Sequence, residues 1–278
     1  MAAESDNLVS VIVPTYKRHD YLALTLESIL SQTHENLEVL VVSDGDDEAT
    51  AAVVSDLNDD RLQYLFIEHS GRPAVPRNEG LRKATGNLLA FCDDDDIWLS
   101  RKLEAQVTVI ADGYQMCNTD YSYIDADGHQ LDQQNYYDKY FGPIDWQTFF
   151  QSMGFICNAS VVFSRRAFKK VGFLNESVDL RAYEDFEYWM RMLYQNKGFF
   201  INRKLVAYRV HQGSIQRDDP RRVLEQRLTL HRSLRKTIAI PPLDYYRKYA
   251  KLMCHYGFDR WPKLKSFIRT VQGRPGAN

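Results

Sequence analysis

Four adjacent aspartates, Asp93 to Asp96, are the feature of this sequence that most directly indicates chemistry. Adjacent carboxylates repel one another, so a fold gains no stability by gathering them unless a cation offsets the repulsion. Oxygen ligands favour Mg²⁺ or Mn²⁺ over zinc, and such an ion usually binds one or two carboxylates together with substrate phosphates. The run therefore predicts a divalent-cation site, with a solvated acidic loop as the alternative.

The segments before this run alternate between strand and helix. Short apolar runs rich in β-branched residues predict buried parallel strands at residues 8–13, 37–42, 62–67 and 87–92, the first ended by Pro14. Helical spacing of apolar residues predicts helices at residues 21–31, 49–57 and 78–84. This alternation is typical of an α/β fold with a largely parallel sheet. The aspartates directly follow the fourth strand, at the sheet edge where ligands of open α/β sheets bind.

The second half of the sequence predicts a mixed arrangement. Strands are expected at residues 116–124, 159–164 and 207–211, and the Asp-Gly at 127–128 predicts a hairpin turn after the first of them. A loop with a short helix is expected at 142–154 and a longer helix at 186–196, followed by two or three helices from Pro220 onward.

Composition narrows the class of protein. The hydrophobic share of 44% and the charged share of 26% are those of an ordinary soluble globular chain. No apolar run approaches the roughly 18 to 20 residues that cross a bilayer, and the polar N-terminus does not resemble a secretory signal. The four cysteines have no paired spacing, which argues against a disulfide framework and a cysteine-ligated zinc. We therefore expect a cytoplasmic protein.

Positive charge gathers in the C-terminal part of the chain. Residues 221–278 contain 14 Lys and Arg against 3 Asp and Glu, although the whole chain has a net charge of −2. This basic tail is compatible with a solvated helical surface, and equally with peripheral contact with anionic lipid at the inner face of the membrane or with an anionic acceptor. Nucleic acid is not expected, because no nucleic-acid-binding motif accompanies the charge.

Several stretches resemble the family 2 inverting glycosyltransferases, which have the GT-A fold. The resemblance spans residues 8–215 and is most specific in RNEGLRKATGNLLAFCDDDD (77–96), which is similar to the family signature that ends in its DXD motif. It implies a GT-A-like nucleotide-binding domain at residues 1–215, with a mixed, mostly parallel central sheet flanked by helices. Residues 8–100 would be the nucleotide-binding half, residues 101–215 the acceptor-binding half, and residues 216–278 a basic helical extension.

The resemblance also implies a site for a nucleotide-sugar donor. VSVIVPTYKR (9–18) is similar to the first strand and base-binding loop of the family, and VVSDGDDEAT (41–50) to its second strand and turn. Asp44 would accept the imide N–H of a uracil or thymine base, unless it is only a turn residue before glycine. Ser43, Asp46 and Asp47 depart from the family pattern, which leaves UDP-, dTDP- and GDP-sugars open. The nucleotide-binding residues implied are Pro14, Thr15, Tyr16, Asp44, Arg77, Asp93 and Asp94.

Within the aspartate run, the resemblance makes Asp93 and Asp95 the DXD pair. Asp95 would be the direct ligand of Mn²⁺ or Mg²⁺, and Asp93 would contact the ribose or the metal shell. Asp96 would orient the sugar or cap a helix starting near Leu99. YRVHQGSIQ (208–216) is similar to the segment that follows the last strand of the family, so His211 would reach the metal or the diphosphate, unless it is structural.

A second acidic motif, AYEDFEYWMRM (182–192), resembles the family motif that carries the catalytic base. Asp185 is the matching residue and would take a proton from the acceptor hydroxyl on the face opposite the leaving diphosphate. The alternative is an acidic first helical turn favoured by the helix dipole. Glu184 would orient the acceptor, and Trp189 would be a core residue or part of the acceptor wall.

Together these features predict a metal-dependent glycosyltransferase. The resemblance to the family implies that it transfers a sugar to a glycan or a lipid-linked acceptor in surface polysaccharide or lipid-linked oligosaccharide assembly. The aromatic loop at residues 136–154 is the expected acceptor wall. The alternatives are a phosphotransfer protein or a non-catalytic binding module on the same fold. A sugar nucleotidyltransferase is disfavoured because PTYKRHD lacks glycine, and a dinucleotide enzyme because no G-x-G-x-x-G follows the first strand.

Overall fold

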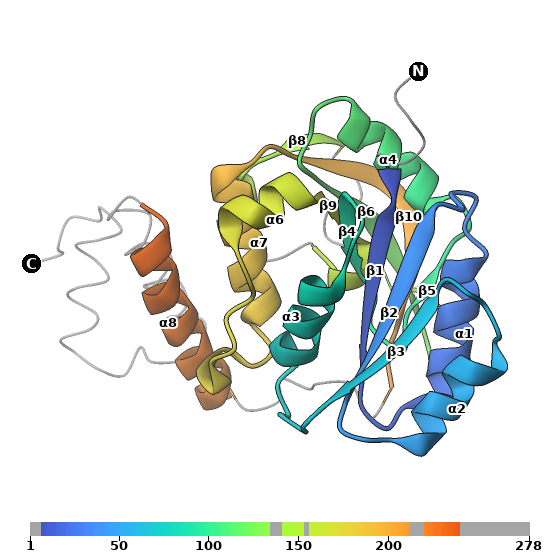
Figure 1. Cartoon of the computed structure of the whole chain (residues 1–278). Helices are drawn as coiled ribbons and strands as arrows, with labels where there is room; N and C mark the ends of the chain where they lie inside the picture. The colour runs from blue at the N-terminus through green and yellow to red at the C-terminus, as the bar shows by residue number, and fades with distance from the viewer. Residues whose placement is uncertain (1–6, 134–140, 153–155, 212–219, 240–278) are drawn as a thin grey trace, which may run out of the picture. The chain divides into compact units, whose positions relative to one another are not determined.

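The computed structural model describes residues 7–133, 141–152, 156–211 and 220–239. The chain divides into two compact units, one formed by Met1–Glu176 with Glu184–Ser214 and the other by Ser177–Tyr183 with Ile215–Asn278. The first unit has the predicted α/β fold, built around one mixed sheet with helices on its faces (Figure 1).

In the described residues this sheet has ten strands, in the order β3-β2-β1-β4-β9-β6-β10-β5, with β7 paired to β6 and β8 to β10. The strands are β1 (Val9–Thr15), β2 (Leu37–Asp44), β3 (Leu62–Ile67), β4 (Leu88–Phe91), β5 (Ile97–Trp98), β6 (Met116–Ile124), β7 (Gln130–Leu131), β8 (Gly142–Ile144), β9 (Val161–Ser164) and β10 (Gly198–Arg209).

The sheet contains two groups of strands, and the strands within each group run parallel to one another. β3, β2, β1 and β4 run parallel to one another, and so do β6 and β10. β9 is antiparallel to both β4 and β6 and so joins the two parts. One continuous sheet therefore passes through both predicted halves, and the carboxyl ends of β1, β2 and β4 meet at one edge.

Helices cover both faces of the first parallel part. Figure 1 shows α1 and α2 on one face of β1–β3 and α3 on the other. The helices of this unit are α1 (His19–Leu30), α2 (Glu48–Asp56), α3 (Ala74–Lys83), α4 (Lys102–Ala111), α5 (Trp146–Ser152), the short 3₁₀ helix η2 (Asn158–Ser160), α6 (Arg165–Val171) and α7 (Glu184–Gln195).

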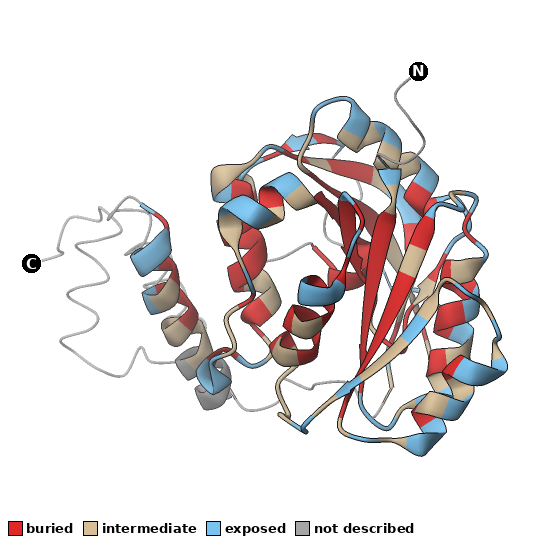
Figure 2. Ribbon diagram, viewed as in Figure 1, coloured by how far each residue is buried: buried red, intermediate tan, exposed pale blue. Residues whose placement is uncertain are grey.

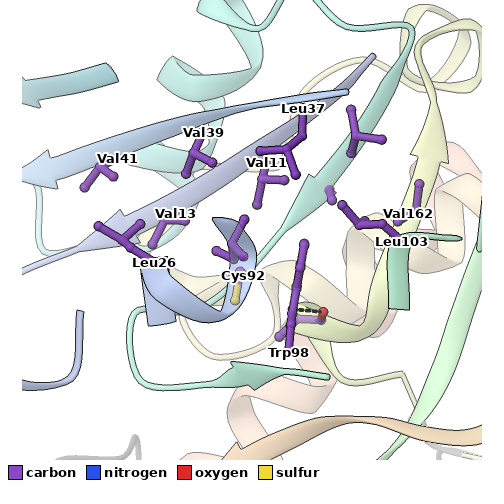
Figure 3. Close-up of a cluster of buried hydrophobic side chains, with 14 of the residues drawn as sticks. Val11, Val13, Leu26, Leu37, Val39, Val41, Cys92, Trp98, Leu103 and Val162 are labelled. Carbon is purple, nitrogen blue, oxygen red and sulfur yellow. Dashed lines mark hydrogen bonds between the residues drawn. The ribbon is translucent and has the colours of Figure 1, made fainter. Parts of the chain in front are cut away.

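The central strand β1 is buried along its whole length because it is covered on both faces (Figure 2). Val11 and Val13 belong to a core cluster that includes Leu26 of α1 (Figure 3). Ile12 points to the other face, where α3 approaches so closely that a Cβ at Gly80 would lie 2.4 Å from Ile12 Cγ2. Only glycine permits this contact without a shift, so Gly80 fixes α3 against the strand that leads to the site.

Several element boundaries differ from the predictions. β1 continues through Pro14 to Thr15, because pairing with β4 has already ended at Ile12 and no N–H is needed on that side. The helix expected near Leu99 begins at Lys102, since Ile97–Trp98 form the short strand β5 instead. α3 begins at Ala74, before the predicted start at residue 78. The last strand is longer than predicted and spans Gly198–Arg209.

The second unit contains the 3₁₀ helix η3 (Val178–Leu180) and the helix α8 (Pro220–Thr237). The two are in contact, and Gln226 Nε2 on α8 donates to the Arg181 carbonyl at 3.0 Å. α8 is one of the C-terminal helices predicted from the sequence. Those expected in residues 240–278 lie outside the described residues.

Candidate functional site

The four aspartates form a tight turn between β4 and β5, at the carboxyl edge of the sheet. Thr25 on α1 holds this turn, because its hydroxyl lies 3.1 Å from the Asp94 carbonyl and 2.9 Å from the Asp96 carbonyl. The backbone therefore bends within the run, and the four carboxylates have different partners.

Asp93 faces the buried guanidinium of Arg77. Arg77 Nη2 donates to Asp93 Oδ1 at 2.5 Å, and Arg77 Nη1 donates to Glu184 Oε1 at 3.1 Å. Burial opposes the charged guanidinium, but Asp93 and Glu184 together raise the pKa of Arg77 above its ordinary value. One arginine thus connects the two acidic motifs. It was predicted to contact the nucleotide, and in this structure its bonds are made to these carboxylates.

Asp94 and Asp95 share a second arginine, which the sequence analysis did not single out. Arg18 Nη1 lies 3.1 Å from Asp94 Oδ1 and 2.8 Å from Asp95 Oδ2. Burial and the neighbouring Asp95 raise the pKa of Asp94 to about 7, against the opposing effect of Arg18. The signal that could have found Arg18 is its position in the loop that follows β1, at the same sheet edge as the aspartates.

Asp95 also meets His211, the other predicted metal ligand. His211 Nε2 lies 2.9 Å from Asp95 Oδ2, and both side chains are about nine-tenths buried, with exposed fractions of 10% and 11%. The fold therefore brings the two predicted ligands into direct contact, Asp95 from the turn after β4 and His211 from just beyond the end of β10.

Asp96 points into the interior. It is fully buried, and its Oδ1 accepts a hydrogen bond from the backbone N–H of Arg209 at 3.0 Å. Burial, with Asp95 and Asp93 nearby, raises the pKa of Asp96 well above its ordinary value. The predicted helix-capping role is wrong, because α4 starts at Lys102 and its N-cap is Arg101. Asp96 instead ties the aspartate turn to β10.

Glu184 and Asp185 begin α7, and their side chains have different surroundings. Glu184 is buried against Arg77, and this burial raises the pKa of its carboxyl group. Asp185 is partly exposed, and its Oδ1 accepts from the N–H of Phe186 at 2.7 Å. Of this pair, Asp185 is therefore the carboxylate that an acceptor can reach, whereas Glu184 is anchored to the aspartate turn.

Trp189 is a core residue. It is 1% exposed, and its ring lies 5.9 Å from Phe91, 5.6 Å from Phe163 and 5.1 Å from Tyr188. This burial excludes Trp189 from an acceptor wall in this structure and agrees with the core alternative. The loop predicted as that wall falls partly outside the described residues.

The predicted base-binding residues gather where β1 and β2 end. Both carboxylate oxygens of Asp44 accept backbone hydrogen bonds, from Ser70 N at 2.7 Å and Gly71 N at 2.9 Å. Each oxygen keeps a second lone pair, so this role in holding the loop is compatible with acceptance from a base. Pro14 and Thr15 are buried within β1.

Tyr16, in contrast, is 43% exposed and stacks on His69, with ring centroids 4.2 Å apart and an interplanar angle of 20°. No sequence motif indicated His69, whose Nδ1 also lies 2.7 Å from the Asp44 carbonyl. The stacked rings of Tyr16 and His69 therefore form an aromatic surface beside Asp44.

The donor set fits a divalent cation. Asp95 Oδ2 and His211 Nε2 supply one oxygen and one nitrogen, so an ion would complete its shell with water and substrate oxygens. The imidazole favours Mn²⁺ over Mg²⁺ within the predicted pair, because Mg²⁺ takes oxygen ligands almost exclusively. Among the described residues, Asp125, Asp127 and His129 form another group with metal-binding spacing, but they lie in the partly or fully exposed turn between β6 and β7.

Solved structures share this architecture. The TarS fragment 1–349 of S. aureus in complex with UDP matches with a TM-score of 0.68 and 18% identity, over 93% of this chain and 74% of that fragment. The complex of the same fragment with UDP-GlcNAc gives a TM-score of 0.70 and 17% identity, over 95% of this chain and 79% of the fragment. These similarities define the class of fold, which is GT-A.

The family follows from the sequence comparison. The family model described as glycosyl transferase family 2 matches residues 10–172, and the chain belongs to this family. The resemblance seen in the motifs is thereby confirmed. In the described residues, no helix is long and apolar enough to span a bilayer.

Curated relatives differ in how much of their length the chain covers. It is 29% identical to WfgD of Escherichia coli, a UDP-Glc:alpha-D-GlcNAc-diphosphoundecaprenol beta-1,3-glucosyltransferase, over 76% of this chain and 80% of WfgD. It is 30% identical to TuaG of Bacillus subtilis, named for teichuronic acid biosynthesis, over 75% and 81%. An uncharacterized glycosyltransferase of Rickettsia bellii is 38% identical, but the match covers 47% of this chain and 19% of that protein.

Proposed function

We propose that this glycosyltransferase inverts the anomeric carbon as it transfers a sugar from a nucleoside diphosphate to an acceptor hydroxyl. The observation that carries the proposal is the bond network of Arg77, which joins Asp93 of the aspartate turn to Glu184 beside Asp185. A donor diphosphate at the aspartate turn and a base on α7 would then act from fixed positions relative to each other. Fixed relative positions are what an in-line displacement requires.

In this proposal Asp185 is the general base. It accepts the proton of the acceptor hydroxyl as that oxygen attacks C1 of the sugar and the bond from C1 to the diphosphate breaks. Because the attack comes from the face opposite the leaving group, an α-linked donor gives a β-linked product. General-base assistance of this kind contributes roughly 10²- to 10⁴-fold to the rate.

Asp95 and His211 would hold Mn²⁺ or Mg²⁺, and a bound ion would supply charge neutralisation of the departing diphosphate. Asp94 lies beside this pair and forms a salt bridge with Arg18. Tyr16 and Asp44 would contact the nucleobase, the former through its exposed ring and the latter through a carboxylate lone pair.

The donor class that the relatives favour is a UDP-sugar. TarS has been solved with UDP and with UDP-GlcNAc, and WfgD is named as a UDP-Glc enzyme. By its name, WfgD acts on a diphosphoundecaprenol-linked GlcNAc, and TuaG is named for teichuronic acid biosynthesis. These names support an acceptor that is a glycan or a lipid-linked sugar, used in surface polysaccharide assembly.

Peripheral contact with an anionic membrane is part of the same proposal. On α8 the side chains of Arg232, Arg235 and Lys236 are exposed, and their spacing places them on one face of the helix. Each basic residue near an anionic surface is worth about 1 kcal/mol. Vesicle sedimentation with and without anionic lipid tests this part, and equal binding to neutral vesicles would exclude it.

The first experiment measures melting temperature with UDP, dTDP and GDP and with their sugars, each with Mn²⁺ and with EDTA. A ligand at 100 times its Kd stabilises the fold by about 2.7 kcal/mol, so a shift with UDP in the presence of Mn²⁺ is expected. NMR of the transferred sugar then gives the anomeric configuration of the product. Retention of configuration, or the absence of any nucleotide shift, would contradict the proposal.

A further inference from the structure

Arg18 occupies a particular position in the carboxylate site. Its guanidinium contacts Asp95 Oδ2 at 2.8 Å, and His211 Nε2 contacts the same oxygen at 2.9 Å. The oxygen expected to bind a divalent cation therefore already interacts with a cationic side chain of this protein. A carboxylate oxygen has few lone-pair positions, so Arg18 and a metal ion compete for this one.

The backbone directs Arg18 to this position. Lys17 adopts a φ of 53°, in the left-handed region that non-glycine residues seldom occupy, and Arg18 is the N-cap of α1. Thr25 further along α1 holds the aspartate turn. The helix that begins at Arg18 is thus fixed to the segment that carries its two carboxylate partners.

The partners differ in their freedom to move. The Asp94 and Asp95 side chains are 6% and 11% exposed, whereas that of Arg18 is 33% exposed. The carboxylates are therefore held by the fold, and the guanidinium is the component that has room to turn toward a ligand. A guanidinium binds phosphate oxygens in the same planar, two-bond manner as it binds carboxylates.

We propose that Arg18 is the resident counter-ion of Asp94 and Asp95 and couples cation binding to diphosphate binding. This inference rests on the proposed function. Without a donor, the positive charge of Arg18 opposes a cation at Asp95. When a nucleoside diphosphate binds, Arg18 transfers its hydrogen bonds to diphosphate oxygens, and Asp95 Oδ2 becomes available as a ligand. Each ligand then raises the affinity of the other by the same factor, as linkage requires.

The test is a titration of Mn²⁺ followed by electron paramagnetic resonance, with and without UDP, on the wild-type chain and Arg18→Gln. The wild type should bind Mn²⁺ more tightly with UDP than without it. Arg18→Gln should bind Mn²⁺ about tenfold more tightly than the wild type in the absence of UDP, a change equivalent to about 1.4 kcal/mol. The factor by which UDP improves Mn²⁺ binding should fall correspondingly in the variant.

Two further variants test whether the positive charge of Arg18 is what weakens Mn²⁺ binding in the absence of UDP. Arg61→Gln removes an arginine that pairs with Asp59 at 2.7 Å, at the opposite end of the parallel strands, and should match the wild type. Arg18→Lys retains the charge, so its donor-free Mn²⁺ affinity should stay within about threefold of the wild type, because like-charge repulsion persists. Thermal unfolding of every variant checks that it is folded. A tenfold gain in Arg18→Lys would overturn the role assigned to the charge.

The donor-free comparison keeps this inference separate from the proposed function. If Arg18→Gln binds Mn²⁺ no more tightly than the wild type in the absence of UDP, the competition is overturned, regardless of the effect of UDP on either protein. If neither protein binds Mn²⁺ with or without UDP, the inference is also overturned. Absence of UDP binding by the wild type, with tighter Mn²⁺ binding in Arg18→Gln, would support the competition and count against the proposed donor.

Discussion

Arg77 and Glu184 are separated by 107 residues of sequence, yet Arg77 Nη1 donates to Glu184 Oε1 at 3.1 Å within the buried part of the fold. The same guanidinium bonds Asp93. Both Arg77 and Glu184 have side chains only 7% exposed, so water cannot replace the contact. This pair fixes the position of the proposed base relative to the aspartate turn.

Replacing Arg77 should therefore affect both stability and transfer. Arg77→Gln leaves Asp93 and Glu184 without their counter-charge, and removing one partner of a buried ion pair costs about 3–5 kcal/mol. We expect a loss of unfolding free energy of this size in urea denaturation. Lys83→Gln on the same helix is the control, because this exposed lysine in the last turn of α3 should contribute about 1 kcal/mol or less. Equal losses in the two variants would contradict the bridging role.

Asp185→Asn should separate binding from chemistry. The amide keeps the shape of the side chain but cannot accept the proton, so transfer should fall by roughly 10²- to 10⁴-fold. The melting shift produced by UDP with Mn²⁺ should remain as in the wild type, because the role proposed for Asp185 concerns the acceptor and not the nucleotide. Asp112→Asn, at the exposed C-cap of α4, is the control. Full activity of Asp185→Asn would remove this residue as the base.

Asp95→Asn should abolish the dependence of UDP binding on Mn²⁺. The variant loses the negative charge that contacts His211, and a neutral amide is a much weaker ligand for a hard cation. Calorimetry of UDP binding with Mn²⁺ and with EDTA measures this dependence. Asp127→Asn in the exposed turn between β6 and β7 should leave it unchanged. The reverse result would place the functional ion at that turn.

The sequence predicted the fold where local patterns are strong. β3 and β6 lie at the predicted residues 62–67 and 116–124, because a continuous or alternating apolar pattern bounded by turns defines a strand directly. β5 and the early part of β10 were missed. β5 has only two residues, and β10 contains Asn202, Arg203 and Lys204, whose polarity hides the strand. The register with β6 shifts at these residues, and pairing on both sides of them sustains the strand.

The sequence motifs indicated the residue types of the candidate site but not the orientation of its side chains. The motifs identified Asp95, His211 and Asp185, and the fold brings Asp95 and His211 together. Periodicity cannot say which of four adjacent carboxylates points inward, because the turn held by Thr25 decides it. Arg18 ends the motif at residues 9–18, but neither that motif nor any pattern around His69 indicates the partner of the side chain, because these contacts join segments far apart in sequence.

Lys102 gives a prediction for stability against pH. Its side chain is fully buried, its Nζ lies 3.7 Å from the centre of the Trp98 ring, and no hydrogen-bond partner for it exists among the described residues. Burial lowers the pKa of Lys102 from its ordinary 10.5 to about 7. Between these values the unfolded chain holds a proton that the folded chain has released, so stability rises with pH. Below about pH 7 both states are protonated and this contribution is constant.

We expect the wild type to gain about 1–2 kcal/mol of unfolding free energy, relative to Lys102→Met, between pH 7 and 8.5. Methionine fills a similar volume without a charge, so the variant should also be more stable than the wild type at pH 7. Urea denaturation across this pH range measures both effects, and the comparison cancels the titration of cysteines that the two proteins share. Lys83→Met removes an exposed lysine in the last turn of α3. Its unfolding free energy should change with pH in the same way as that of the wild type. If the unfolding free energies of Lys102→Met and the wild type changed with pH in the same way, Lys102 would have to stay protonated in the folded protein.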